Sequence, residues 1–127
     1  MKYLCIVYAG AGPDTLTKAE HIAIKDACIE EDHALFASGK LIAASPLQGP
    51  ETAVVIRPSG RTDGPYAETK EFVAGFMLIE AGSIEEAVAI AAPGPLEGLV
   101  TLEIRPLADE RHSRTGLDRS AFFARRS

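Results

Sequence analysis

The fold is decided by one stretch of the chain, Thr62-Asp63-Gly64-Pro65-Tyr66-Ala67-Glu68-Thr69-Lys70-Glu71, and by the apolar run Phe72-Val-Ala-Gly-Phe-Met-Leu-Ile79 that follows it. Asp63-Gly64-Pro65 predicts a turn, because Asp can bond to its own backbone, Gly adopts positive φ at little cost and Pro fixes φ. The run after it is apolar on both alternating faces, which is typical of a strand buried on both sides. We therefore expect a turn that leads into a strand buried on both sides, with Gly75 at a bend or a close packing contact.

The N-terminal part of the chain predicts a second strand of this kind and a long helix. The strand is expected at residues 2–9, with Tyr3, Cys5 and Val7 on one face and Leu4, Ile6 and Tyr8 on the other. Residues 16–38 follow helical spacing, with Asp14 or Thr15 as the N-cap and Gly39 at the end. The apolar residues of this helix form two stripes, Ile22, Ile29 and Phe36, and Ile24, Cys28 and Leu35.

The remaining elements complete a repeated pattern. Strands are expected at residues 41–45, 52–57 and 100–105, with an arm at residues 61–67. Ser83 and Glu86 have the spacing of a capping box for a helix at residues 83–92, which Pro93-Gly94-Pro95 ends. The last strand places Val100, Leu102 and Ile104 inward and Thr101, Glu103 and Arg105 outward.

This order of elements predicts an α+β fold. Two β-α-β units with a hairpin insertion between them build a ferredoxin-like antiparallel sheet with both helices on one face. The strands at residues 2–9 and 72–79 are nevertheless apolar on both faces, so the second face needs a cover. We expect that a second copy of the chain supplies it, in a homodimer.

Composition sets the class of protein. A chain of 127 residues with 46% hydrophobic and 24% charged residues fits one globular domain. No apolar run reaches the roughly 18 residues of a membrane span, and the apolar run at the N-terminus is too short for a secretory signal. We therefore expect a cytoplasmic protein without a membrane partner. Cys5 and Cys28 lack the spacing of a disulfide frame or a zinc site, and we expect no metal.

Charge is distributed unevenly. Residues 111–127 hold five Arg and one Asp, whereas residues 1–110 hold 8 basic and 17 acidic residues. An acidic body argues against nucleic acid as a partner. We therefore divide the chain into a folded domain at residues 1–107 and a basic C-terminal tail at residues 108–127. The tail could be a short helix that packs on the partner subunit or a disordered basic arm, and such an arm could also contact an acidic partner protein or nucleic acid.

The run Asp63 to Glu71 resembles the defining motif of the DGPF group of YCII-related proteins, with Tyr66 where Phe is usual. The N-terminal Met-Lys-Tyr-Leu, the stretch from Gly39 to Gln48 and the segment Leu102 to Pro106 match the same pattern. The resemblance covers roughly residues 1–107 and implies a dimeric α+β barrel of ferredoxin-like protomers. It also implies a cleft between helices and sheet, without naming a cofactor.

The resemblance does not bring a mechanism with it. YCII-like relatives carry a His on the first helix and an Asp late in the chain, which fall here near Cys28 and near residues 92–94, where neither residue type occurs. His21, two turns before Cys28, is a candidate substitute. DGPF members are also often found beside extracytoplasmic-function sigma factors, which implies a sigma factor as a partner.

Candidate site residues follow from these observations. His21 or His33 with Asp63 or Glu68 could form an acid–base pair, because His titrates near neutral pH and a carboxylate can orient it. We expect His33 to be the more buried histidine and Tyr66 to pack at the edge of a pocket. The residues expected to bind a ligand are Tyr66, Glu68, Lys70 and Arg105.

Two functions remain open from the sequence. The first is binding of a small polar metabolite in a cleft bordered by the 63–71 turn and the first helix, with or without acid–base catalysis. The alternative is a non-catalytic regulatory or protein-interaction module, linked to a sigma factor.

Overall fold

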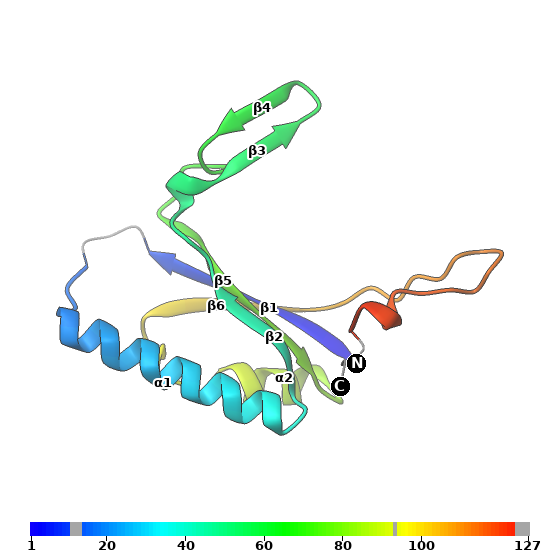
Figure 1. Ribbon diagram of the computed structural model, residues 1–127, viewed down its shortest axis with the longest axis horizontal. Coiled ribbons are helices and arrows are strands. Elements are labelled where there is room, and N and C mark those ends of the chain that lie inside the picture. The colour runs from blue at the N-terminus through cyan, green and yellow to red at the C-terminus, as the bar shows by residue number, and fades with distance from the viewer. Residues whose placement is uncertain (11–13, 93, 124–127) are drawn as a thin grey trace.

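Figure 1 shows a computed structural model of the chain, which describes residues 1–10, 14–92 and 94–123. Parts of the predicted breaks at residues 10–13 and 93–95 and the last four residues of the predicted tail lie outside this range. The helices and strands are β1 (Lys2–Gly10), α1 (Lys18–Ala37), β2 (Leu41–Pro46), β3 (Val54–Arg57), β4 (Gly60–Asp63), β5 (Glu71–Glu80), α2 (Ile84–Ala91) and β6 (Val100–Pro106). Two short 3-10 turns, η1 (Pro50–Thr52) and η2 (Ser120–Phe123), complete the described chain.

The four long strands form one antiparallel sheet in the order β2-β5-β1-β6. Both helices lie on one face of this sheet in Figure 1. This is the ferredoxin-like α+β arrangement, so the predicted fold class is confirmed. The two strands that are apolar on both faces, β1 and β5, are neighbours at the centre of the sheet.

The core lies between the sheet and the helices. Tyr3 and Ile79 face each other across β1 and β5 and are 4% and 0% exposed. The other buried apolar residues are Cys5, Leu41, Ala81 and Ala87. Helix α1 contributes Leu35 to this core, whereas Ile22, Ile29 and Phe36 of the first predicted stripe stay nearly half exposed. Only one of the two predicted stripes therefore faces the sheet.

The helix N-termini differ in detail from the predictions. Helix α1 is capped by Thr17, not by Asp14 or Thr15, and Thr17 and Glu20 form a complete capping box. Ser83 caps α2 as predicted and accepts a bond from the Glu86 amide. The Glu86 carboxylate bonds instead to the amide of Gly82, so the second half of that predicted box is wrong.

Gly75 lies where β5 passes closely along β2. A Cβ atom at this position would lie 2.9 Å from the carbonyl oxygen of Ser45 and 3.2 Å from Cα of Pro46. The register between β1 and β5 also shifts at this point, between Val7 and Tyr8. The predicted close contact at Gly75 is confirmed.

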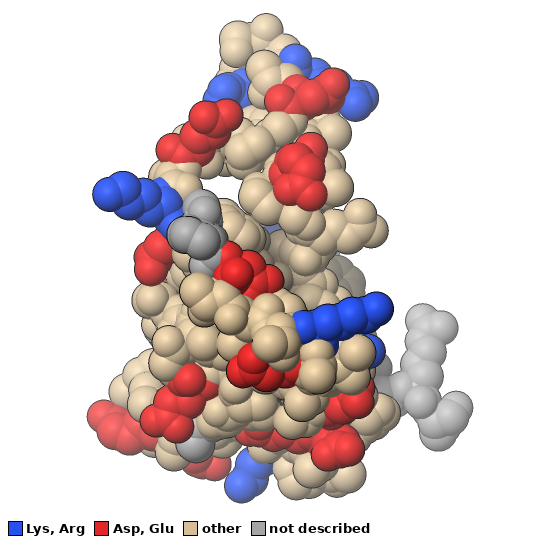
Figure 2. Space-filling view, turned by 90° about the vertical axis from the view of Figure 1, so that its left-hand side faces the viewer, with Lys and Arg blue, Asp and Glu red and all other residues tan. Residues whose placement is uncertain are grey.

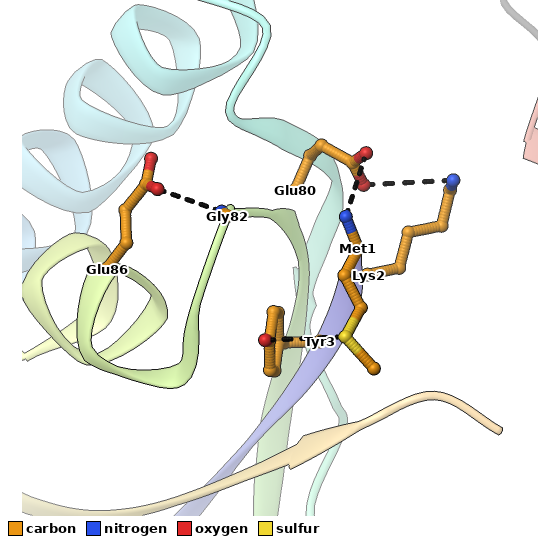
Figure 3. A network of polar contacts seen from close by, with 6 residues as sticks. All are labelled: Met1, Lys2, Tyr3, Glu80, Gly82 and Glu86. Atoms are coloured by element: carbon orange, nitrogen blue, oxygen red, sulfur yellow. Dashed lines mark hydrogen bonds and ion pairs between the residues drawn. The ribbon is translucent and has the colours of Figure 1, made fainter.

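Polar contacts join the start of β1 to the end of β5 at one end of the sheet, as Figure 3 shows. The N-terminal amine and the Lys2 side chain lie 3.4 Å and 3.7 Å from the two carboxylate oxygens of Glu80. Beyond β6, the chain returns to this end, where the Phe123 ring lies 5.3 Å from the Lys2 amine. The described part of the tail therefore contacts its own domain.

Strands β3 and β4 form a two-stranded hairpin, hereafter the hairpin arm (residues 54–63). In Figure 1 the hairpin arm rises on the side of the sheet opposite to the helices. The open face of the sheet and the hairpin arm therefore border the same space.

Candidate functional site

A strip of polar side chains crosses the open face of the sheet near the base of the hairpin arm. Strand alternation places Cys5, Met77 and Ile104 toward the helices, and therefore Tyr8 and its neighbour Thr101 on the open face. The four residues of this polar strip are Tyr8 of β1, Glu71 of β5, and Thr101 and Glu103 of β6.

Glu71 reaches across β1 to the far strand. Its partner in the β1–β5 register is Gly10, which has no side chain to block the path. The Thr101 hydroxyl on β6 donates a hydrogen bond to the Glu71 carboxylate, with 3.3 Å between the oxygens. This bond therefore joins β5 to β6 across the intervening strand β1.

Tyr8 is the central ionisable group of the polar strip. Its hydroxyl donates a hydrogen bond to Oε1 of Glu103 at 2.8 Å. This bond, partial desolvation and the Glu103 charge raise the pKa of the Tyr8 phenol; Arg105 opposes the rise and Glu71 adds to it. Tyr8 is therefore a neutral hydrogen-bond donor throughout the physiological pH range.

Beside the polar strip lies a groove of about 500 Å³, a volume suited to a small molecule. Tyr8, Glu71 and Val73 of the open face contribute to its lining. The chain segments 47–53 and 65–72 supply the other lining residues, which are mainly apolar. In Figure 2 the molecule is hollowed below the hairpin arm, and acidic side chains border the hollow.

Two of the predicted ligand-binding residues lie near this groove. Tyr66 contributes to the lining but is 77% exposed, so it borders the groove without packing in it. The Arg57 guanidinium lies 5.0 Å from the Tyr66 ring centre and donates a bond to the Tyr66 carbonyl. Arg105 faces the open side of β6, close enough to Tyr8 to act on its pKa.

The other predicted residues lie elsewhere. Asp63 is at the end of β4, where its exposed carboxylate pairs with Arg61 at 3.3 Å. Glu68 and Lys70 are exposed and do not line the groove. The structure does not bring these three residues together with a histidine, and their roles stay predictions.

Both predicted histidines are on α1, across the sheet from the groove. Nε2 of His21 lies 2.5 Å from Oδ2 of Asp14, in a local contact before the helix. This bond and a backbone bond from Leu16, which is the larger cause, lower the pKa of Asp14. His33 is exposed, as is His21, so the expectation that His33 is the partly buried histidine is wrong.

A second set of titratable residues lies on the half-buried side of α1. Burial raises the pKa of Cys28, Glu31 and Asp32, and the neighbouring carboxylates add to the rise for Cys28 and Glu31. A Cβ atom at Gly94 would lie 2.9 Å from a Glu31 oxygen. Glu31 of α1 is therefore close in space to Gly94, in the segment that follows α2.

The sequence missed the polar strip because its members are far apart along the chain. Glu103 and Tyr8 each occupy a visible alternating position, but their contact depends on the register between β1 and β6. The outward positions of residues 100–105, aligned against the second face of residues 2–9, are the signal that could have found it.

The described residues show neither a metal-ion cluster nor a membrane-spanning helix. Across residues 1–10, 14–92 and 94–123, no three His, Cys, Asp or Glu side chains are grouped to hold a metal ion. No helix in the same ranges is long and apolar enough to span a membrane.

Fold and groove together define a small ferredoxin-like α+β domain with a ligand-sized groove on its open sheet face. The chain belongs to the family of proteins with a YCII-related domain, whose family profile matches residues 1–110. The predicted family is confirmed, and the DGPF subgroup stays a prediction from the motif at residues 63–71.

Two known proteins are similar to this chain. An uncharacterised protein of Rhizobium meliloti (strain 1021) is 40% identical over an alignment of 79 residues, which covers 56% of this chain and 62% of that protein. A solved structure of 5-chloro-2-hydroxyhydroquinone dehydrochlorinase from Burkholderia phenoliruptrix AC1100, in complex with 2,5-dihydroxybenzoquinone, aligns with a TM-score of 0.45 at 16% identity. That alignment covers 87% of this chain and 96% of the other.

Proposed function

We propose that this YCII-related protein binds a small polar metabolite in the groove beside the polar strip and performs acid–base chemistry there. The observation that carries the proposal is Tyr8, which lines the groove and whose hydroxyl donates a 2.8 Å hydrogen bond to Glu103. A hydroxyl bonded to a carboxylate can exchange a proton with a ligand within hydrogen-bond reach.

The two residues have complementary roles in this proposal. The Tyr8 oxygen, whose single proton is donated to Glu103, accepts a hydrogen bond from a donor group of the ligand and can take that group's proton as its own proton passes to Glu103. The Glu103 carboxylate accepts the bond from the same phenol and holds it in one orientation. Glu71, which also lines the groove, fixes a polar group of the ligand.

A ligand screen with matched variants tests this function. Thermal melting of the wild-type protein with a panel of small amines, phenols and hydroxy acids identifies ligands that stabilise it, and Tyr8→Phe should lose that stabilisation. Tyr3→Phe is the control, because it removes the same hydroxyl on the opposite side of β1, where Tyr3 contacts Met1. Equal stabilisation of Tyr8→Phe and wild type would exclude the Tyr8 hydroxyl from the site.

The proposal includes a homodimer formed through the open face. Leu4 and Leu78 face each other there, as do Ile6 and Phe76, and these four apolar side chains are only half-buried. Covering them by a second copy removes apolar surface from water. Leu78→Asp should convert a dimer into a folded monomer in a light-scattering measurement, and a wild-type monomer would contradict this arrangement.

We place this function in the cytoplasm. Cys5 and Cys28 are free thiols, which suit a reducing compartment. In the described part of the chain no contact favours the alternative of an interaction module for a sigma factor.

A further inference from the structure

We infer that the groove takes a cationic amine carried on an apolar body about the size of one ring. The inference rests on the proposed function, because it names the class of ligand for the same groove.

The walls suit an apolar body. They are formed by two opposing chain segments, 47–53 and 65–72, which meet the open face of β5. Proline and aromatic side chains present flat apolar surfaces with little freedom to lose on binding. The apolar members of the lining with the largest side chains are Leu47, Pro50, Pro65, Tyr66, Phe72 and Val73.

The charge of the groove's lining determines which polar group of a ligand is favoured. Glu71 is the one charged residue among the groove's described lining, which contains neither Lys nor Arg. Its described side-chain bond comes from the neutral Thr101 hydroxyl, which leaves its negative charge uncompensated. Glu103, bonded by the neutral Tyr8 hydroxyl, adds a second negative charge beside the groove.

Three cations are near the groove but are not among its described lining residues: Arg57, Arg105 and Lys70, the exposed neighbour of Glu71. Arg57 stacks on the Tyr66 ring and bonds to the Tyr66 carbonyl. Arg105 pairs with Leu4 in the register, farther along β6 from Thr101 than Glu103 is. A ligand amine at Glu71 would therefore form a charge-assisted hydrogen bond without a competing cation in the groove.

Ligands with a negative end are disfavoured in this groove. A carboxylate or phosphate placed beside Glu71 would be repelled by Glu71 and Glu103, and no cation in the described lining would compensate for it. A neutral alcohol of the same shape would keep the apolar contacts and lose the ion pair. The three ligand types therefore separate the contribution of charge from that of shape.

The test compares three probes with a common phenyl-alkyl skeleton on the full-length protein: 2-phenylethylamine, 2-phenylethanol and 3-phenylpropanoate. We expect 2-phenylethylamine to bind at least about tenfold more tightly than the alcohol, as measured by titration calorimetry or NMR shifts, and the carboxylate to bind most weakly. Glu71→Gln should abolish the preference for the amine. Glu30→Gln, an exposed change on α1 across the sheet, should leave it unchanged.

The outcomes distinguish the ligand class from the groove itself. Equal binding of the three probes, lost in an Ala67→Trp variant that fills the groove, would overturn the amine class and leave the proposed groove in place. Amine binding that survives Glu71→Gln would overturn the assignment of the ion pair. If 2-phenylethylamine did not bind at a concentration of roughly 10 mM, the inference would also be overturned, because a typical fragment has a lower dissociation constant than that.

Discussion

The Tyr8 hydroxyl and the Glu103 carboxylate are joined by a hydrogen bond of 2.8 Å, although the two residues are 95 positions apart in the sequence. In the register of β1 and β6, Glu103 is opposite Ile6 and Tyr8 is opposite Thr101. The bond is therefore diagonal, between neighbouring pairs of the same sheet face. Such contacts depend on strand order and register, and they place a donor and an acceptor beside a groove that neither strand forms alone.

Replacing Glu103 by Gln should lower the pKa of the Tyr8 phenol. The carboxylate raises this pKa because it accepts a bond that the ionised phenolate cannot donate, and because its charge repels the phenolate. Gln is neutral and its amide can turn to donate to the phenolate. A pH titration of the tyrosine ultraviolet absorbance measures the change, and the same titration on Tyr8→Phe identifies which step belongs to Tyr8.

The same bond has a pH-dependent effect on stability. A group whose pKa is higher in the folded than in the unfolded chain stabilises the fold below the unfolded value, here about 10 for tyrosine. That contribution is lost as the pH rises through the folded value. The control Glu85→Gln, on α2, should leave the tyrosine titration unchanged. If Glu103→Gln also left it unchanged, the contact between Tyr8 and Glu103 would be contradicted.

The sequence predicted the fold well, because strands and helices of this chain have local signatures. Residues 2–9 and 72–79 are apolar on both faces, which predicted strands buried on both sides, and the two strands are neighbours at the centre of the sheet. The helix start was misplaced because Asp14, Thr15 and Thr17 are all acceptable caps, and only Thr17 is followed three residues later by Glu20. That spacing was visible in the sequence and is decisive in the structure.

The candidate site was harder to predict, because it depends on contacts between distant elements. The charged residues Asp63, Glu68 and Lys70 stand out in the sequence, yet they lie in exposed positions. Tyr8 looked like one more apolar residue of a buried strand, although it faces the groove. Composition marks where charge is concentrated along the chain, whereas the sheet register decides which charges meet.

Gly75→Ala should destabilise the fold by about 2 kcal/mol. The added Cβ atom would lie 2.9 Å from a backbone oxygen of the neighbouring strand, so β2 and β5 would have to separate. Denaturant unfolding measures the difference. Gly10→Ala is the control, since its nearest neighbour in the described chain, the Lys70 oxygen, is 4.0 Å from the added atom; equal stability of the two variants would show that the close contact does not hold.

Asp32→Asn should stabilise the protein at neutral pH, by less than about 1 kcal/mol because Asp32 lies outside the fully buried core. Burial raises the pKa of this carboxyl, with the neighbouring His33 opposing the rise. The folded state therefore favours the protonated acid, and stability decreases as the pH rises from the unfolded pKa through the folded one. The gain from Asn should be present above this range and vanish below it.

Melting temperatures across the acidic and neutral range provide the measurement for Asp32. Asp26→Asn is the matched control, because it removes the same charge from an exposed position of the same helix. If the melting temperature rose equally in both variants at every pH, the rise would come from the reduced negative charge of α1 and not from the burial of Asp32.

Thr17→Ala should destabilise the protein by about 1 kcal/mol, the usual cost of losing an N-cap. The Thr17 hydroxyl accepts a bond from the Glu20 amide at 3.1 Å, and the Glu20 carboxylate accepts one from the Thr17 amide at 3.1 Å. Alanine removes the first bond and leaves an amide of the first helical turn without its acceptor. Thr15→Ala makes the same chemical change two residues earlier, outside this capping box, and should have little effect in denaturant unfolding. If Thr15→Ala proved the more destabilising of the two, α1 would begin earlier than Lys18, at the cap that the sequence pattern first indicated.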